Sequence, residues 1–289
     1  MPTVAITGAS GFVGTALQKM FQENGYKVIS IRRDVAKDIF KLTEIVEQSD
    51  IIINLAGASI IARWSESYKK ELYDSRINIT KNLVEAIGKA LKKPALLIST
   101  SAVGIYTNNR SHSEFEYEYN NDFLGNLAKD WENTALEAKK FDVRCVIFRF
   151  GIVLGKQGGA FAKMLTPFRF GLGGKIGNGK QYFSFIHIND LCRAFKFVVE
   201  NNSQQGIYNL TAPNVTTNDR LTKVLATSLN RPAFFDVPEF VLKLIFGEGA
   251  KVLTDGQNVY PKKLLDNGFV FEFDNIDKGL KWKFYQRLT

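Results

Sequence analysis

Short apolar runs alternate with amphipathic stretches along the first half of the chain. The apolar runs predict strands, and the stretches between them carry apolar residues at helical spacing. The predicted strands are 4–6, 27–31, 50–57, 95–98 and 143–149. The predicted helices are a first one from Phe12 that stops at Asn24 and Gly25, a short one within 35–49, and long ones at 65–91 and 122–139. Strands that alternate with helices through short loops indicate a parallel α/β sheet with right-handed crossovers.

The pattern changes after Leu154, where residues 155–179 are rich in glycine and contain two apolar patches. Strands are predicted at 183–187 and 206–210, with a helix at 190–200 that Asp190 is expected to cap. Helical segments follow at 218–229, 238–246 and 261–267. We therefore expect a doubly wound domain from 1–154, to which 183–211 returns, and a smaller substrate or lid domain from 155–182 and 212–289.

The turn after the first strand carries Gly8, Gly11 and Gly14 at the spacing G-x-x-G-x-x-G. The first glycine permits a tight turn, the second lets backbone N–H groups approach a pyrophosphate, and the third lets the helix pack closely. A strand before the glycines and a helix after them predict a Rossmann-type dinucleotide site, with phosphates on the helix N-terminus. Its expected contacts are Gly8, Ser10, Gly11, Phe12 and Val13.

The end of the second predicted strand indicates which nicotinamide cofactor is bound. An acid there holds a ribose 2′-hydroxyl, whereas an arginine accommodates a 2′-phosphate. This chain has Arg32 and Arg33, with Asp34 one place later. Two guanidiniums suit a phosphate dianion, which favours NADP(H) over NAD(H); a pair of solvated surface arginines is the alternative. The small-residue loop Leu55, Ala56 and Gly57 is expected to lie over the cofactor.

Composition narrows the class of protein. Hydrophobic residues make up 45% and charged residues 23% of the 289 residues, as in soluble globular proteins. The formal net charge is +9, but the lysines and arginines are scattered, which does not favour nucleic-acid binding. No apolar run approaches the roughly 18 residues of a membrane span. A strand at the N-terminus argues against a signal peptide. The two cysteines lie in apolar segments, which fits free thiols in the cytoplasm. With only two histidines, a zinc site is not expected.

Several segments taken together resemble an atypical, epimerase-like branch of the extended short-chain dehydrogenase/reductases, whose members are often called nucleoside-diphosphate-sugar epimerases. The resemblance covers nearly the whole chain and rests on these segments: 54–57 (NLAG), 63–64 (RW), 74–76 (DSR), 122–124 (DFL), 130–132 (DWE), 149–155 (RFGIVLG), 183–187 (FSFIH), 230–232 (NRP), 247–248 (GE), 256–257 (GQ) and 261–264 (PKKL). It implies a Rossmann domain, a small C-terminal substrate domain and NADP(H). It also places Thr100, Gly151 and Ile152 at the cofactor.

The resemblance implies a catalytic set of Asn, Ser, Tyr and Lys, from which this chain departs. Ser101 matches the serine, and Lys129 matches the lysine that holds the nicotinamide ribose and lowers the pKa of the tyrosine. The tyrosine would fall at Gly125, which has no side chain, and Arg76 occupies the asparagine position. The candidate catalytic residues are therefore Ser101, Lys129, Tyr106 and Arg76.

Three interpretations remain open at this point. The chain is an enzyme that uses another acid, such as Tyr106, His187 or a bound water. Alternatively, it binds NADP(H) and a ligand without turnover, as a sensor or regulatory protein. In the third, compatible with either, Lys129 is an ordinary surface lysine. The first interpretation predicts an NADP(H)-dependent oxidoreductase or epimerase-like enzyme for a small polar substrate, possibly a nucleotide sugar.

Four residues are candidates for contacting that substrate, each with a structural alternative. The side chain of Trp64 either walls the pocket or covers the core. Gln181 and Ser184 lie at the predicted domain junction and either touch substrate or hydrogen-bond at the surface. His187 lies between apolar residues in a strand, which also suits a core histidine. Beyond a small-molecule substrate we expect no nucleic-acid or membrane partner and a monomer or homodimer.

Overall fold

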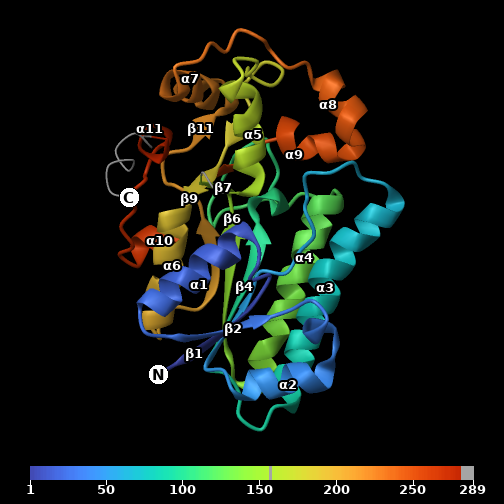
Figure 1. Cartoon of the computed structure of the whole chain (residues 1–289), viewed down its shortest axis with the longest axis vertical. Coiled ribbons are helices and arrows are strands. Elements are labelled where there is room, and N and C mark those ends of the chain that lie inside the picture. Colours follow the sequence, from blue (N-terminus) through green and yellow to red (C-terminus); the bar gives the residue numbers. More distant parts are fainter. Residues whose placement is uncertain (156–157, 281–289) are drawn as a thin grey trace.

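A computed structural model describes residues 1–155 and 158–280 and is built around a parallel sheet (Figure 1). Within these residues the sheet has six strands in the order β10-β6-β4-β3-β1-β2. The strands are β1 (Thr3–Thr7), β2 (Lys27–Ile31), β3 (Ile51–Asn54), β4 (Leu96–Ala102), β6 (Arg144–Phe150) and β10 (Gly206–Leu210). The central strands are buried on both faces, which explains their continuous apolar runs.

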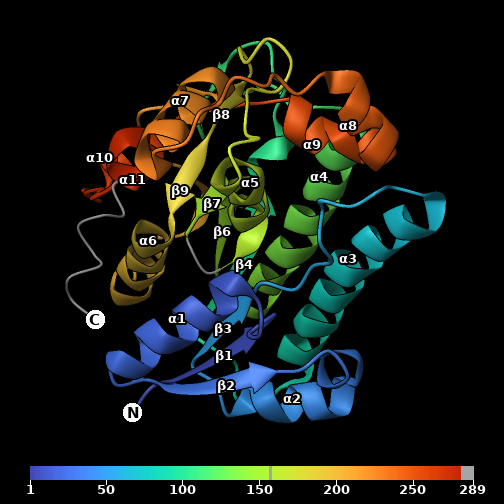
Figure 2. The ribbon, with the colours of Figure 1, turned by 45° about the horizontal axis from the view of Figure 1, so that its top comes forward.

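Helices cover both faces of the sheet, as Figure 2 shows. One face carries α1 (Phe12–Glu23) and α6 (Ile188–Glu200), and the other carries α2 (Ile39–Glu47), α3 (Glu66–Lys89) and α4 (Phe123–Leu136). Two separate cores result: Leu17 of α1 and Phe195 of α6 pack in the first, and Leu42 of α2 and Leu83 of α3 in the second. The Rossmann-type doubly wound fold expected from the sequence is thus confirmed.

The chain reverses its direction across the sheet between the neighbouring strands β1 and β3. From β1 the chain continues to β2 on one side, and from β3 it continues to β4 on the other side. The glycine turn follows β1, and the loop Leu55–Gly57 follows β3. Because ligands of open α/β sheets bind beyond the carboxyl ends of strands at such a reversal, this is where a cofactor site is expected.

A third apolar core lies beyond the carboxyl ends of the sheet strands (Figure 1). It joins Phe161 and Leu165, Phe185, Leu221 and Ile276. The elements involved are β7 (Ile152–Leu154), α5 (Gly159–Arg169), β8 (Tyr182–Phe183), β9 (Phe185–His187), β11 (Thr216–Thr217), α7 (Asn218–Leu229) and α11 (Ile276–Gly279). Helix α5 occupies the glycine-rich stretch for which the sequence predicted only apolar patches.

The remaining helices and strands are short. They are η1 (Val35–Lys37), η2 (Val103–Ile105), β5 (Ser111–His112), η3 (Glu137–Phe141), α8 (Glu239–Phe246), η4 (Gly247–Ala250), α9 (Lys251–Thr254), β12 (Asn258–Val259) and α10 (Lys262–Asp266). No helix within the described residues combines the length and apolar character that crossing a membrane requires.

Polar side chains of the earlier part of the chain hold the backbone of residues 257–273 in place. The Ser184 hydroxyl donates to the Gln257 carbonyl oxygen at 2.7 Å and accepts from the Val259 N–H at 3.1 Å. The fully buried Asp190 carboxylate accepts the N–H groups of Glu272 and Phe273. Asn209, Thr211 and Glu114 make similar bonds to Tyr260, Val259 and Lys263.

The cap of α6 differs from the expectation that Asp190 would provide it. His187 Nδ1 accepts the Asn189 N–H at 3.3 Å, so the histidine is the cap. Asp190 lies in the first turn, where it bonds the C-terminal segment and Arg193. A buried carboxylate needs such donors, and the C-terminal backbone supplies them.

Candidate functional site

The backbone of the glycine turn leaves the start of α1 open. Gly8 has φ +65°, a conformation that favours glycine, and a β-carbon there would lie 2.7 Å from the Leu55 carbonyl oxygen. A β-carbon at Gly14 would collide with the Gly8 carbonyl oxygen, so α1 packs directly on the turn. No side chain caps α1, and its first turn holds no acid. Its N–H groups therefore remain available for an anion, which fits a cofactor pyrophosphate.

A cavity of about 1200 Å³ runs from this turn to the end of β2. The expected cofactor residues that line it are Gly8, Ser10, Gly11, Arg32, Arg33, Leu55, Ala56 and Gly57. Both arginines are exposed, and Arg32 is bidentate to Asp34, with nitrogen–oxygen distances of 3.2 and 2.7 Å. A 2′-phosphate would find two guanidiniums here, one of them shared with a carboxylate.

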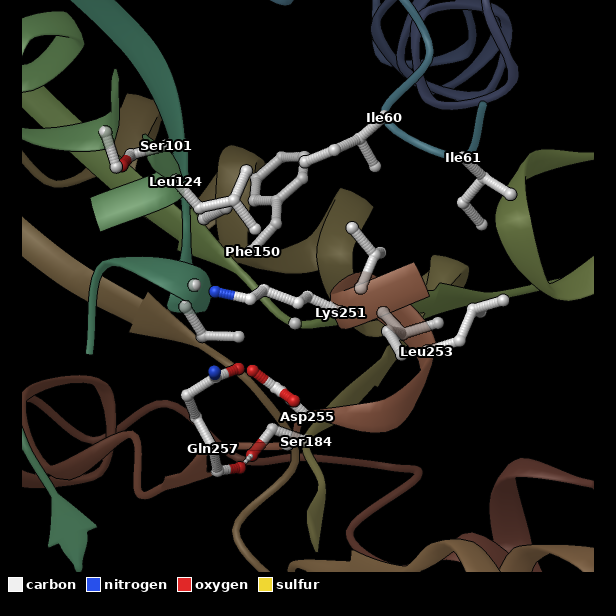
Figure 3. A pocket seen from close by; sticks show the side chains of 18 of the residues that line it. Ile60, Ile61, Ser101, Leu124, Phe150, Ser184, Lys251, Leu253, Asp255 and Gln257 are labelled. Carbon is white, nitrogen blue, oxygen red and sulfur yellow. Dashed lines mark hydrogen bonds between the residues drawn. The ribbon is translucent and has the colours of Figure 1, made fainter. Parts of the chain in front are cut away.

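A second cavity of about 410 Å³ continues from Leu55, which lines both (Figure 3). It opens beyond the carboxyl ends of β4 and β6 and is closed on the other side by α9 and the residues after it. Residues that the sequence singled out and that line it are Val13, Arg76, Thr100, Ser101, Gly151, Ile152, Gln181 and Ser184. The structure therefore brings several of the expected cofactor residues and two of the substrate candidates together in one cavity.

Ser101 stands out in this cavity because its hydroxyl is buried and unpartnered. It is 3% exposed, and its Oγ is the one buried side-chain nitrogen or oxygen atom of the described residues that lacks a hydrogen-bond partner. Burial of an unpaired hydroxyl is unfavourable by roughly 1–3 kcal/mol. A ligand oxygen in the cavity would complete its hydrogen bonding.

Arg76 brings a positive charge to the same cavity without a carboxylate partner in the hydrogen bonds it makes. Its two terminal nitrogens donate to the carbonyl oxygens of Leu72 and Ala58, and its guanidinium lies over the Trp131 ring. Burial lowers the pKa of Arg76 to about 10, so the group stays cationic at neutral pH. Gly57 makes room for it, since a β-carbon there would lie 3.0 Å from the guanidinium carbon.

The missing tyrosine has a structural reason. A β-carbon at Gly125 would collide with the Asn120 carbonyl oxygen, so no side chain fits at this position with the present loop. Lys129, one turn further along α4, donates to Asn121 Oδ1 at 3.0 Å and lies over the Tyr119 ring. It lines neither cavity.

Tyr106, one of the candidate catalytic residues, is fully buried and lines neither cavity. Its hydroxyl accepts from Arg149 Nη1 at 2.6 Å and donates to Asn209 Oδ1 at 2.7 Å. Burial raises the pKa of this phenol above its ordinary value. Arg149 in turn forms a bidentate, buried ion pair with Glu132 of α4 at 2.7 and 2.6 Å. Tyr106 therefore belongs to a structural network with Arg149 and Glu132. This network lies beside Ser101, because Ser101 on β4 is paired with Arg149 on the adjacent strand β6.

Three other candidates also lie outside both cavities. The His187 ring stacks on the Phe273 ring, with 3.7 Å between the ring centroids. Burial lowers the pKa of His187 to about 4, so the histidine is a neutral helix cap at physiological pH. Trp64 donates from Nε1 to the Ile60 carbonyl oxygen and packs on Phe123, which positions the loop that lines the cavity. The Phe12 side chain fills the space beside Gly155.

Sequence reasoning missed the part of the cavity wall that the C-terminal segment provides. Lys251, Leu253, Asp255 and Gln257 face Ser101, Leu124 and Phe150 across the cavity in Figure 3. Gly256 and Gln257 are among the segments that carry the family resemblance. Nothing in the sequence, however, indicates that they meet Ser101, some 150 positions earlier in the chain. Ile60 and Ile61 were likewise not predicted to line the site.

The chain matches two protein families in successive regions. A model of the NAD dependent epimerase/dehydratase family matches residues 4–211, and a domain of unknown function, DUF1731, matches 237–282. The mouse protein named epimerase family protein SDR39U1 is 36% identical over 96% of this chain and 98% of its own length. A chloroplastic SDR39U1 homolog from Arabidopsis thaliana is also 36% identical, over 96% of this chain and 86% of its own length.

A solved structure agrees with these matches. The human epimerase family protein SDR39U1, crystallised with NADPH, superposes with a TM-score of 0.86 at 32% identity and covers 96% of this chain and 98% of its own. The two family regions meet here at the second cavity, the first region bringing Ser101 and the second Leu253. The chain therefore belongs to the NAD dependent epimerase/dehydratase family, among the epimerase family proteins related to SDR39U1.

Proposed function

We propose that the protein is an NADP(H)-dependent oxidoreductase that reduces or oxidises a small molecule in the Ser101 cavity. The observation that carries this is the unpartnered, buried Ser101 hydroxyl in the second cavity, which shares Leu55 with the cavity of the glycine turn. The family match and the NADPH complex of the human relative support the cofactor. When bound, NADPH supplies a hydride.

The residues of the cavity suit the oxygen of a carbonyl or hydroxyl substrate. Ser101 can donate a hydrogen bond to that oxygen, and the Arg76 cation favours negative charge that develops on it. Neither role needs the tyrosine that Gly125 excludes. The glycine turn and the arginines after β2 would hold the pyrophosphate and the 2′-phosphate.

We expect the chain to bind NADPH more tightly than NADH, and Arg32→Ala/Arg33→Ala to shrink this preference at least tenfold. Each charge-assisted contact to the 2′-phosphate contributes about 1.5–3 kcal/mol, and tenfold corresponds to about 1.4 kcal/mol. Calorimetric titration of both cofactors measures the effect, with Lys19→Ala on the exposed face of α1 as the control. Equal affinities of the wild type for NADPH and NADH would refute the assignment.

Hydride transfer itself tests the proposal. The protein is incubated with NADPH deuterated at C4 and a metabolite extract, and mass spectrometry identifies a compound that gains deuterium. Ser101→Ala should lower kcat for that compound about 100-fold, the usual loss when one oxyanion donor is removed. Ser111→Ala, at an exposed position of β5, should leave kcat unchanged. If no compound in any extract gains deuterium, the protein binds its cofactor without turnover and the proposal is wrong.

A further inference from the structure

The second cavity has mainly apolar walls drawn from every element around it. Such side chains come from the loop after β3, from α4, from the end of β6, from β7, from α5 and from α9. They are Ile60, Ile61, Leu124, Leu127, Phe150, Ile152, Met164, Val252 and Leu253. Several of these, including Ile61 and Leu253, are only half-buried in this structure. Apolar surface left open in a concave site is the usual mark of a site for an apolar ligand.

The charges in the cavity balance. Of its described lining residues, two are basic, Arg76 and Lys251, and two are acidic, Asp122 and Asp255. The Lys251 side chain is exposed, with its Nζ 3.9 Å from the Asp122 carboxylate. No surplus of positive charge is left for a strongly anionic group.

This balance is unlike what a nucleoside diphosphate requires. Each phosphate of such a ligand needs a cation or several N–H donors, because a buried charge must be paired. Here each terminal nitrogen of Arg76 already donates one N–H to a carbonyl oxygen, and Lys251 shares its charge with an aspartate. The volume of about 410 Å³ is also near the lower end of the roughly 300–1,000 Å³ of small-molecule sites.

Building on the proposed oxidoreductase function, we infer that the substrate is a compact, largely apolar ketone or the corresponding alcohol, and not a nucleotide sugar. Its carbonyl oxygen meets Ser101, and its apolar body lies between Leu124, Phe150 and Leu253. One uncharged polar group at its far end would meet Lys251, Asp255 and Gln257, which offer donors and acceptors together (Figure 3).

The corresponding reaction balances with NADPH as the reductant. The carbonyl carbon accepts the hydride, and the π electron pair of the C=O bond moves to the oxygen. That oxygen takes a proton from water, so the products are the alcohol, NADP⁺ and hydroxide. The reverse reaction oxidises the alcohol.

Binding of defined probes tests this inference without turnover. 1-Indanone, 1-acenaphthenone and UDP-glucose are titrated by calorimetry and saturation-transfer NMR into the wild-type protein, with and without NADP⁺. We expect at least one ketone to bind and UDP-glucose not to bind at the same concentrations. Leu253→Asp should weaken ketone binding at least tenfold, whereas Leu244→Asp, at an exposed position of α8 that does not line the cavity, should not change it.

Ile61→Ser is a second variant on the opposite wall, in case Leu253→Asp does not fold, and it should weaken ketone binding as well. Circular dichroism and an unchanged affinity for NADPH verify the fold of both variants. Failure of every ketone to bind, tighter binding of UDP-glucose, or full ketone affinity in the folded wall variants would overturn the inference. A wild type that does not bind NADPH would instead refute the proposed function. The two failures can be told apart, because binding of the probes is also measured without cofactor.

Discussion

Gly11→Val should abolish NADPH binding while the protein remains folded. Gly11 has φ −76°, which valine adopts readily, and lies exposed at the start of α1. A β-carbon there would be 3.2 Å from the Gly8 carbonyl oxygen, and the rest of the side chain would enter the cavity where the pyrophosphate must approach. Losing two or three charge-assisted contacts of about 1.5–3 kcal/mol each corresponds to roughly 100-fold or more in affinity.

Fluorescence titration with NADPH measures this loss, and circular dichroism verifies the fold. Thr15→Val is the matched control, since it places the same side chain one turn further along α1 at an exposed position. It should bind NADPH normally. A folded Gly11→Val protein with wild-type affinity would mean that the turn has a structural role only.

Glu132→Gln should lower the free energy of unfolding by about 3–5 kcal/mol, the loss typical when one partner of a buried ion pair is removed. The carboxylate of Glu132 is 5% exposed and bonds the Arg149 guanidinium through both oxygens. A neutral amide keeps the shape but leaves the arginine charge without its counter-ion. Urea unfolding followed by circular dichroism gives the free energy of unfolding.

Two comparisons separate the buried charge from a general effect of substitution. Glu132→Gln added to Arg149→Met should be far less destabilising than Glu132→Gln alone, because the charge that needed pairing is gone. Asp266→Asn, in the exposed pair with Lys262, should change stability by less than about 1 kcal/mol. A loss for Glu132→Gln no larger than that of Asp266→Asn would contradict the prediction.

The sequence predicted most of the strands and helices because local rules govern them. The spacing of Gly8, Gly11 and Gly14 predicted both the turn and the open helix start. Ser65 and Asp122 stand at the start of the two long predicted helices, and their side chains accept the N–H groups of Tyr68 and Gly125. These contacts span only three residues, so the order of residues is enough to predict them.

Predictions that depended on distant contacts were less successful. Asp190 was expected to cap α6, but its carboxylate bonds residues 82 and 83 positions later, and His187 takes the cap. Tyr106 follows the Ser101 strand closely, yet the buried Arg149 holds its hydroxyl away from the cavity. Side-chain direction in such cases is decided by a partner that periodicity does not reveal.

The hydrogen bonds that hold residues 257–273 also bear on how this chain could have evolved. Ser184, Asp190 and Asn209 complete their hydrogen bonding with backbone groups that belong to the region matched by DUF1731. A gene that lost this region would leave those buried groups of the dinucleotide-binding part with fewer hydrogen-bond partners, and a gene that exchanged it would need a replacement backbone in the same register. The two regions should therefore be inherited as one unit, and their substitutions should be constrained jointly.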